Sequence, residues 1–185
     1  IINQDIQRLD RLVTDISNAS RLDAELSREG MKKIDIKKIL EETVIFYNRE
    51  KKKILFNFIK DTNYITYGNE LRLSQVFNNL IDNALSFNKD NKKIEIFLKN
   101  SKNNIFIEIS DYGPGIPINN FNKVFDRFYT ERPSGEKFGQ HSGLGLSIVK
   151  QILDVHKGVI KVENRTEKNK KIDGAKFTII FEKVI

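Results

Sequence analysis

Three short segments carry residues whose types and spacing could bind a nucleotide. The segment QVFNNLIDNA, residues 75–84, places Asn79 and Asn83 one helical turn apart, so both amides project from one helix face. The segment DYGPGI, residues 111–116, puts a carboxylate before a turn whose glycines permit positive φ angles. The segment HSGLGLSI, residues 141–148, puts two glycines where an amphipathic helix would begin. Each segment alone is a weak signal, but in this order they predict a site for Mg²⁺, a purine and a triphosphate.

The two asparagines offer amide oxygens, which Mg²⁺ accepts in an octahedral shell completed by phosphates and water. Asn79 and Asn83 border the apolar stripe of their predicted helix without belonging to it. Both residues also fit ordinary surface or capping asparagines, because the chain is rich in this residue type.

Asp111 ends a predicted strand and stands just before Gly113, Pro114 and Gly115. A carboxylate held there can accept a hydrogen bond from an exocyclic amine such as N6 of adenine. It would reject guanine, whose 6-oxo group is itself an acceptor. Taken alone, however, a turn or capping aspartate is the simpler interpretation of Asp111.

Gly143 and Gly145 flank Leu144 at the start of a predicted helix. Backbone N–H groups point outward at such a start, and the helix dipole is positive there, so phosphate binds well. Ser142 is a natural N-cap, which also explains the segment without a ligand. His141 either contacts a phosphate or is exposed on the preceding loop.

Hydrophobic periodicity predicts the elements that position these residues. The clearest helix covers residues 71–87, a second covers 144–156, and a third follows residue 38. Strands are expected at residues 34–36, 54–59, 65–68, 94–99, 105–110, 159–164 and 175–181, and residues 121–129 read as short helix. The polar run at residues 130–140 predicts a mobile loop. Together these elements predict an α/β two-layer sandwich whose mixed sheet is covered on one face by helices.

Residues 1–28 carry apolar side chains at near-heptad spacing, which predicts one long helix ending before Gly30. The apolar stripe is too narrow to form a core by itself, so this helix would pair in a coiled coil or bundle. The chain begins at Ile1, which suggests a fragment of a longer protein.

The composition narrows the function classes. There is no cysteine, which excludes disulfides and thiolate metal sites, and two histidines without a third make a zinc site improbable.

No apolar run approaches the roughly 18 to 20 residues that span a bilayer, and there is no signal-peptide pattern. The net charge is +7, but the lysines are scattered, so we favour a solvated basic surface over a nucleic-acid site. His156 is expected to be a last-turn helix residue without a chemical role.

The motifs resemble those of the GHKL superfamily of ATP-binding proteins, and within it the sensor histidine kinases. QVFNNLIDNA is similar to their N box, DYGPGI to the first glycine box, FDRFY at residues 125–129 to the F box, and HSGLGLSIVKQI to the second glycine box. The resemblance implies the Bergerat (GHKL) ATP-binding fold for residues 31–185. Residues 1–30 resemble, more weakly, the second helix of the dimerisation and phosphotransfer hairpin, most like alphaproteobacterial envelope- or acid-sensing kinases.

The resemblance also implies roles for individual residues. Asn83 would bind Mg²⁺ with help from Asn79, and Asp111 would bind adenine. The residues implied to contact the nucleotide are Asn79, Asn83, Phe87, Asp111, Gly113, Gly115, Ile116, Ser142, Gly143, Leu144, Gly145 and Leu146. The catalytic set is Asn79, Asn83 and Arg127.

Two departures from the family pattern stand out. Many relatives carry a lysine where this chain has Ser86, so the phosphates would be neutralised by Arg127, Arg132 or Lys137. The phosphoacceptor histidine, which is followed by an acidic residue in the family, is absent, because neither histidine of this chain has that setting.

The implied function is transfer of the γ-phosphate of Mg·ATP to a histidine outside this chain. The implied partners are the phosphoacceptor helix of the same or a partner protomer, a response regulator and, in the full-length protein, a second copy. Binding to nucleic acid is not expected. A membrane would be contacted only through segments missing from this chain, as expected for the cytoplasmic portion of an inner-membrane protein. One alternative is a GHKL ATP hydrolase, but hydrolases of this superfamily have a glutamate at the position of Asn79. An amide cannot act as a general base, so this alternative ranks below the kinase. The other is a non-catalytic module that uses nucleotide for assembly.

Overall fold

The computed structural model describes residues 30–50, 52–60, 62–88, 92–130, 143–166 and 171–184. The predicted helix at residues 1–28, most of the predicted loop at 130–140, and His141, Ser142, Arg132 and Lys137 lie outside the described residues. In the described part, no helix is both long enough and apolar enough to cross a membrane.

A five-stranded sheet forms the back layer, in the order β2-β4-β5-β7-β6. The strands are β2 (Ile54–Phe58), β4 (Ile94–Asn100), β5 (Asn104–Ser110), β6 (Val159–Thr166) and β7 (Ile172–Glu182). Strand β2 runs parallel to β4, and the other neighbours are antiparallel, so the predicted mixed sheet is confirmed. The predicted hairpin between β4 and β5 is also confirmed.

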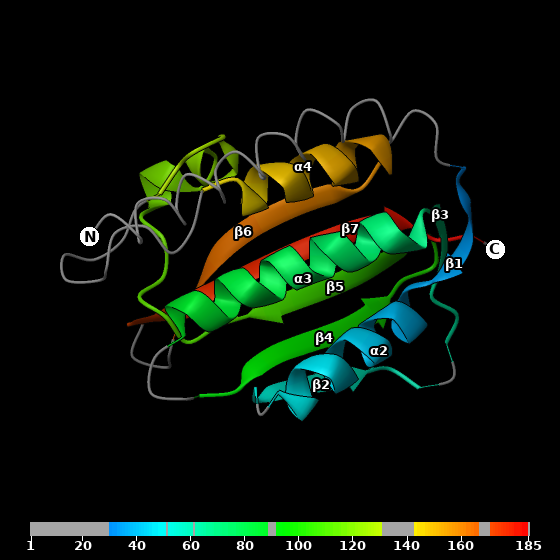
Figure 1. Cartoon of the computed structure of the whole chain (residues 1–185), viewed down its shortest axis with the longest axis horizontal. Helices are drawn as coiled ribbons and strands as arrows, with labels where there is room; N and C mark the ends of the chain where they lie inside the picture. The colour runs from blue at the N-terminus through cyan, green and yellow to red at the C-terminus, as the bar shows by residue number, and fades with distance from the viewer. Residues whose placement is uncertain are drawn as a thin grey trace, which may run out of the picture.

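Three helices cover one face of this sheet: α2 (Ile36–Arg49), α3 (Glu70–Phe87) and α4 (Gly145–Val155). Helix α3 lies across the middle of the sheet with α4 and α2 on either side of it (Figure 1). A small antiparallel pair, β1 (Lys32–Asp35) and β3 (Ile65–Gly68), lies at one end. The predicted α/β two-layer sandwich is therefore confirmed, although Ile36 begins a helix instead of ending a strand.

In the described residues between β5 and α4 the chain forms the 3₁₀ turns η1 (Ile118–Asn120) and η2 (Lys123–Phe125), and η2 lies where the sequence predicted short helix. Phe125 packs edge-on against Phe177 of β7, with ring centroids 6.3 Å apart. The F-box segment is thereby attached to the core beside the start of α4.

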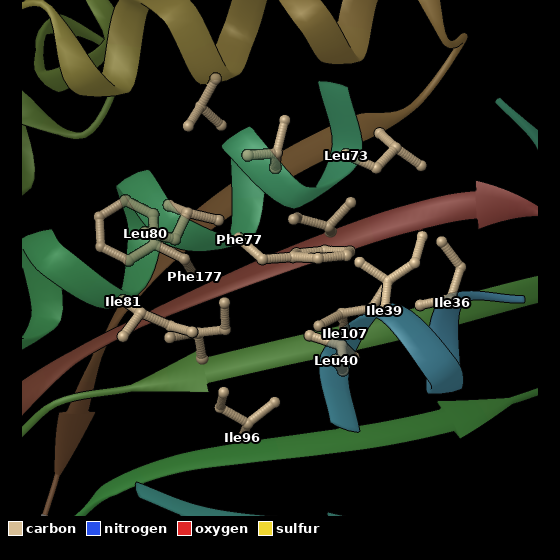
Figure 2. Packing of buried hydrophobic residues seen from close by; sticks show 14 of the residues in the cluster. Ile36, Ile39, Leu40, Leu73, Phe77, Leu80, Ile81, Ile96, Ile107 and Phe177 are labelled. Carbon is tan, nitrogen blue, oxygen red and sulfur yellow. The ribbon is translucent and has the colours of Figure 1, made fainter. Parts of the chain in front are cut away.

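The core lies between the sheet and the helices because both kinds of element bury one face. On α3 the buried side chains recur at helical spacing, and on the strands they alternate. Figure 2 shows Phe77 and Leu80 of α3 above strand residues Ile96, Ile107 and Phe177. All five are at most 2% exposed, so α3 packs tightly against β4, β5 and β7, and β5 leads directly into the first glycine box.

Side-chain caps fix the ends of α3 and α4. Asn69 accepts a hydrogen bond from the Arg72 N–H at 3.0 Å and so caps the start of α3. His156 follows α4, is 7% exposed, and accepts from the Asn69 N–H through Nε2 at 3.0 Å. Its Nδ1 lies 2.7 Å from the carbonyl oxygen of Ile152, so the ring joins the end of α4 to the start of α3.

Candidate nucleotide-binding site

The N box and the second glycine box meet through Asn79. Its Nδ2 donates to the carbonyl oxygen of Gly145, the first residue of α4, at 3.3 Å. This bond joins two segments that lie 66 residues apart in sequence, and it leaves Oδ1 of Asn79 without a hydrogen bond among the described residues. Asn79 thus has a structural contact as well as an available oxygen.

Asn83 lies one turn further along α3 on the same face and is partly buried. Its backbone carbonyl accepts from the Ser86 hydroxyl at 2.8 Å. Within the described part of the chain its side-chain amide makes no hydrogen bond. The amide oxygen that the sequence singled out is therefore available to a cation.

Asp111 follows β5 and is only 3% exposed. Its Oδ1 accepts two backbone hydrogen bonds, from Gly113 at 2.8 Å and from Ala175 of β7 at 3.0 Å. The backbone N–H of Asp111 in turn donates to the carbonyl of Ala175 at 3.0 Å. Oδ2 has no hydrogen-bond partner among the described residues, so it remains an acceptor for a ligand.

Burial raises the pKa of Asp111 above its ordinary value. The two backbone hydrogen bonds and the positive charge of Arg165 lower this pKa, but they do not compensate for the loss of hydration. A carboxylate that is held at an energetic cost and keeps one acceptor oxygen is typical of a recognition group.

The glycines of the first box are required by close packing. A Cβ at Gly113 would lie 2.7 Å from the carbonyl oxygen of Phe87, the last residue of α3. Gly115 has φ +75°, and a Cβ there would collide with Ile172 and lie 2.8 Å from Oδ1 of Asn164. Both glycines let the loop after Asp111 pass between α3 and the sheet edge.

The glycines of the second box differ from each other. Gly143 has φ +71°, its carbonyl accepts from the Phe128 N–H at 3.1 Å, and a Cβ would lie 2.9 Å from the Tyr129 carbonyl oxygen. Internal packing therefore explains Gly143. A Cβ at Gly145, by contrast, would meet nothing within 4 Å among the described residues, so the described structure leaves the space beside this glycine open.

Leu144 and Leu146 were predicted to contact the nucleotide. The side chain of Leu144 is 1% exposed and belongs to the core, and the partly buried Leu146 packs against that core. These two residues can therefore offer a ligand only their backbone. The exposed Arg127 lies next to Phe128, and thus beside the second glycine box.

Sequence reasoning missed Asn164, on β6. Its Oδ1 accepts from the Ile116 N–H at 2.8 Å, and its Nδ2 donates to the Ile116 carbonyl at 2.7 Å. The alternation in VIKVEN places Ile160, Val162 and Asn164 on the helix-covered face. A polar residue ending an inward-facing apolar series was the available signal.

A second cluster behind Asp111 was also missed. The Arg165 guanidinium lies 4.0 Å from the ring centroid of Tyr112, whose hydroxyl donates to Glu95 at 2.7 Å. Arg165 also pairs with Glu95 at 3.4 Å. The cluster fixes the residue that follows Asp111 and supplies the nearby positive charge.

Residues 68–185 match the family described as histidine kinase-, DNA gyrase B- and HSP90-like ATPase. The chain belongs to this ATPase family. It is also similar to the sensor protein ChvG of Rhizobium meliloti (strain 1021), with 43% identity over 189 residues that cover 97% of this chain and 33% of that protein. The chain thus spans about a third of the length of this curated relative.

Two solved structures of histidine kinases are also similar to this chain. The nucleotide-free catalytic domain of histidine kinase ThkA has a TM-score of 0.68 and 26% identity, covering 84% of this chain and 99% of that chain. ThkA in complex with the response regulator protein TrrA has a TM-score of 0.71 and 26% identity, covering 100% of this chain and 50% of that chain. The ATPase-family domain described here is therefore the catalytic, ATP-binding domain of a sensor histidine kinase. The expected similarity to alphaproteobacterial sensors is confirmed by the Rhizobium and Agrobacterium relatives.

Proposed function

We propose that residues 31–185 bind Mg·ATP between the N box and the two glycine boxes and deliver the γ-phosphate to a histidine outside this chain. The observation that carries the proposal is the free Oδ2 of the buried Asp111, at the same end of α3 as the available amide of Asn83. An acceptor for a base and an oxygen for a cation are thus offered by neighbouring segments.

The donor set fits the adenine end of ATP. Oδ2 of Asp111 would accept from the N6 amine, while Gly113 and Gly115 leave room for the ring beside them. Phe87 and Ile116 would border the base, because the Phe87 carbonyl lies beside Gly113 and Ile116 follows Gly115. Guanine would place an acceptor against the carboxylate, so we expect a strong preference for ATP.

The open space before Gly145 fits the phosphate end. The first turn of α4 has backbone N–H groups without an intrahelical acceptor, as every helix start does, and carries the positive end of the helix dipole; Gly143 to Leu146 would offer the phosphates their backbone. Ser142 would extend this set. Arg127 would supply the positive charge that Ser86 does not.

The amide oxygens of Asn83 and Asn79 fit a hard cation that prefers oxygen ligands. Bound Mg²⁺ would neutralise phosphate charge and fix the orientation of the triphosphate. The contact from Nδ2 of Asn79 to Gly145 directs this residue toward the same space. The domain would act mainly by positioning, because it contributes neither nucleophile nor general base.

The relatives support the remaining proposals. We propose that residues 1–30 are the second helix of a dimerisation hairpin, that the full-length protein is a homodimer, and that the nucleophilic histidine lies on the preceding helix of either protomer. ThkA is recorded in complex with a response regulator, which supports a response regulator as the next acceptor here. Since sensor ChvG is about three times as long as this chain, we also propose a cytoplasmic location within an inner-membrane sensor.

Phosphotransfer in two pieces tests the proposal. The chain is mixed with Mg·ATP and a separately made hairpin that carries the upstream histidine, and acid-labile phosphate on the hairpin is measured. We expect transfer by the wild-type chain, its loss in Asn83→Ala, and normal transfer in Asn78→Ala, an exposed asparagine on the same helix. Phosphate release to water at a comparable rate without the hairpin would indicate a hydrolase. Unmeasurable ATP binding would leave only an assembly module.

A further inference from the structure

The loop of the first glycine box is held at both of its ends. At its start, Asp111 exchanges backbone and side-chain hydrogen bonds with Ala175 of β7. At its end, Asn164 of β6 binds both backbone groups of Ile116, at 2.8 and 2.7 Å. The side chain of Asn164 thus does what a neighbouring strand would do, since it pairs one N–H and one carbonyl of the loop.

The place of Asn164 in the sheet explains how it reaches the loop. It pairs with Ala175 in the β6–β7 ladder, and the register shifts between Asn164 and Thr166. Such an irregularity bends a strand and redirects its side chains. Asn164 is therefore one strand away from the residue that holds Asp111, and it acts on the opposite end of the same loop.

Asn164 also limits the space beside Gly115. That glycine has φ +75°, and an added Cβ would lie 2.8 Å from Oδ1 of Asn164. The loop accordingly follows the surface of Asn164, and a side chain that repels the Ile116 carbonyl would push the loop away from β6.

We propose that Asn164 is a positioning residue for adenine recognition: its two bonds to Ile116 hold the first glycine box in the conformation that presents Oδ2 of Asp111 to the base. This inference rests on the proposed function, because it assumes that ATP occupies this site. Asn164 itself need not touch the nucleotide.

An aspartate at this position provides a reversible test. An ionised carboxylate keeps the acceptor for the Ile116 N–H but places a second negative oxygen against the Ile116 carbonyl. A protonated carboxyl instead donates its O–H to that carbonyl and restores both bonds. Partial burial and the facing carbonyl favour this protonated form. The defect of Asn164→Asp should therefore diminish as the pH falls.

The experiment measures ATP affinity by calorimetry for wild type, Asn164→Asp, Asn164→Ala and the control Asn100→Asp. The control makes the same chemical change at another partly buried asparagine, whose side chain donates one hydrogen bond, to the carbonyl of Asn63. Affinities are compared as ratios to wild type at each pH, because Asp111 titrates in all four proteins. Hydrogen exchange at the Ile116 amide and thermal unfolding are measured on the same nucleotide-free samples.

At neutral pH we expect Asn164→Asp to bind ATP roughly tenfold more weakly, with faster exchange at Ile116. The ratio should return toward one as the pH falls, whereas Asn164→Ala should stay weak throughout and Asn100→Asp should match wild type. If wild type binds ATP and Asn164→Asp binds it equally well at neutral pH, or with a ratio independent of pH, the positioning role is wrong. A wild-type protein that binds no ATP would instead overturn the proposed function and this role with it.

Discussion

Replacing Asp111 by asparagine should make the domain more stable while nearly abolishing ATP binding. The substitution preserves the shape of the side chain and removes its charge. Three donors compete for acceptors at this residue: the N–H groups of Gly113 and Ala175, and the N6 amine of the bound base. A carboxylate serves all three with two oxygens, whereas an asparagine has one acceptor oxygen and an NH₂ group that donates.

The sign of the stability change follows from the pKa. Burial raises the pKa of Asp111, so the folded state disfavours the ionised form despite the two hydrogen bonds and Arg165. A raised aspartate pKa means that this group destabilises the fold at neutral pH and that the penalty disappears as the pH falls through the folded-state pKa. Asparagine is neutral at every pH and keeps Oδ1, so we expect a gain of about 1 kcal/mol.

The binding loss is larger than the stability gain. With Oδ1 held by the two backbone N–H groups, the new NH₂ group faces the N6 amine of adenine, and two donors are left opposed in a buried site. If the amide turns over, the same mismatch falls on Gly113 and Ala175 instead. The first orientation loses one buried hydrogen bond and the second loses two, and both leave opposed donors, which should reduce ATP affinity about 100-fold or more.

Thermal unfolding and calorimetric titration of the same samples measure both effects. A gain of about 1 kcal/mol raises the unfolding midpoint by about 2–4 °C in a domain of this size. Asp173→Asn is the matched control, because Asp173 forms a surface ion pair with Lys92 at 3.3 Å and should change neither quantity measurably. A less stable Asp111→Asn variant that binds ATP as well as wild type would refute the reasoning.

Four further predictions concern the same site. Asn83→Ala should lose the increase in ATP affinity that Mg²⁺ confers but keep Mg²⁺-free ADP binding, and equal loss of both in calorimetry would argue against a metal role. Gly145→Ala should unfold like wild type but bind ATP roughly tenfold more weakly, because an added methyl meets only open space in the described structure. Gly143→Ala should instead destabilise the fold by about 1–3 kcal/mol, since φ is +71° and Tyr129 is close, and an unchanged melting curve would contradict this. ATP affinity should fall as the pH falls through the raised pKa of Asp111, because the protonated carboxyl no longer accepts from N6. A pH profile as flat as that of Asp111→Asn would contradict that assignment.

The sequence was sufficient to predict those helices and strands whose structure is decided by local hydrophobic periodicity. The apolar stripe of α3 and the alternation in β4 and β5 reflect burial of one face, and that burial is what holds Asn83 and Asp111 in place. The cap at Asn69 was equally readable, because capping depends on neighbours within one turn.

Contacts between distant segments were not predictable in the same way. Asn164 and Ile116 lie 48 residues apart, and His156 and Asn69 lie 87 apart, so no local pattern indicates either pair. The second glycine box shows the same limit. Gly143 and Gly145 looked alike in sequence, but only the structure shows that the F-box segment packs against Gly143 and leaves Gly145 open.

A crystal structure of the chain with Mg²⁺ and a non-hydrolysable ATP analogue would test the central claim most directly. The account predicts the N6 amine within hydrogen-bonding distance of Oδ2 of Asp111, the metal on the amide oxygen of Asn83, and the phosphates before Gly145. Nucleotide density remote from both Asp111 and Asn83, or no density at saturating ligand, would contradict it.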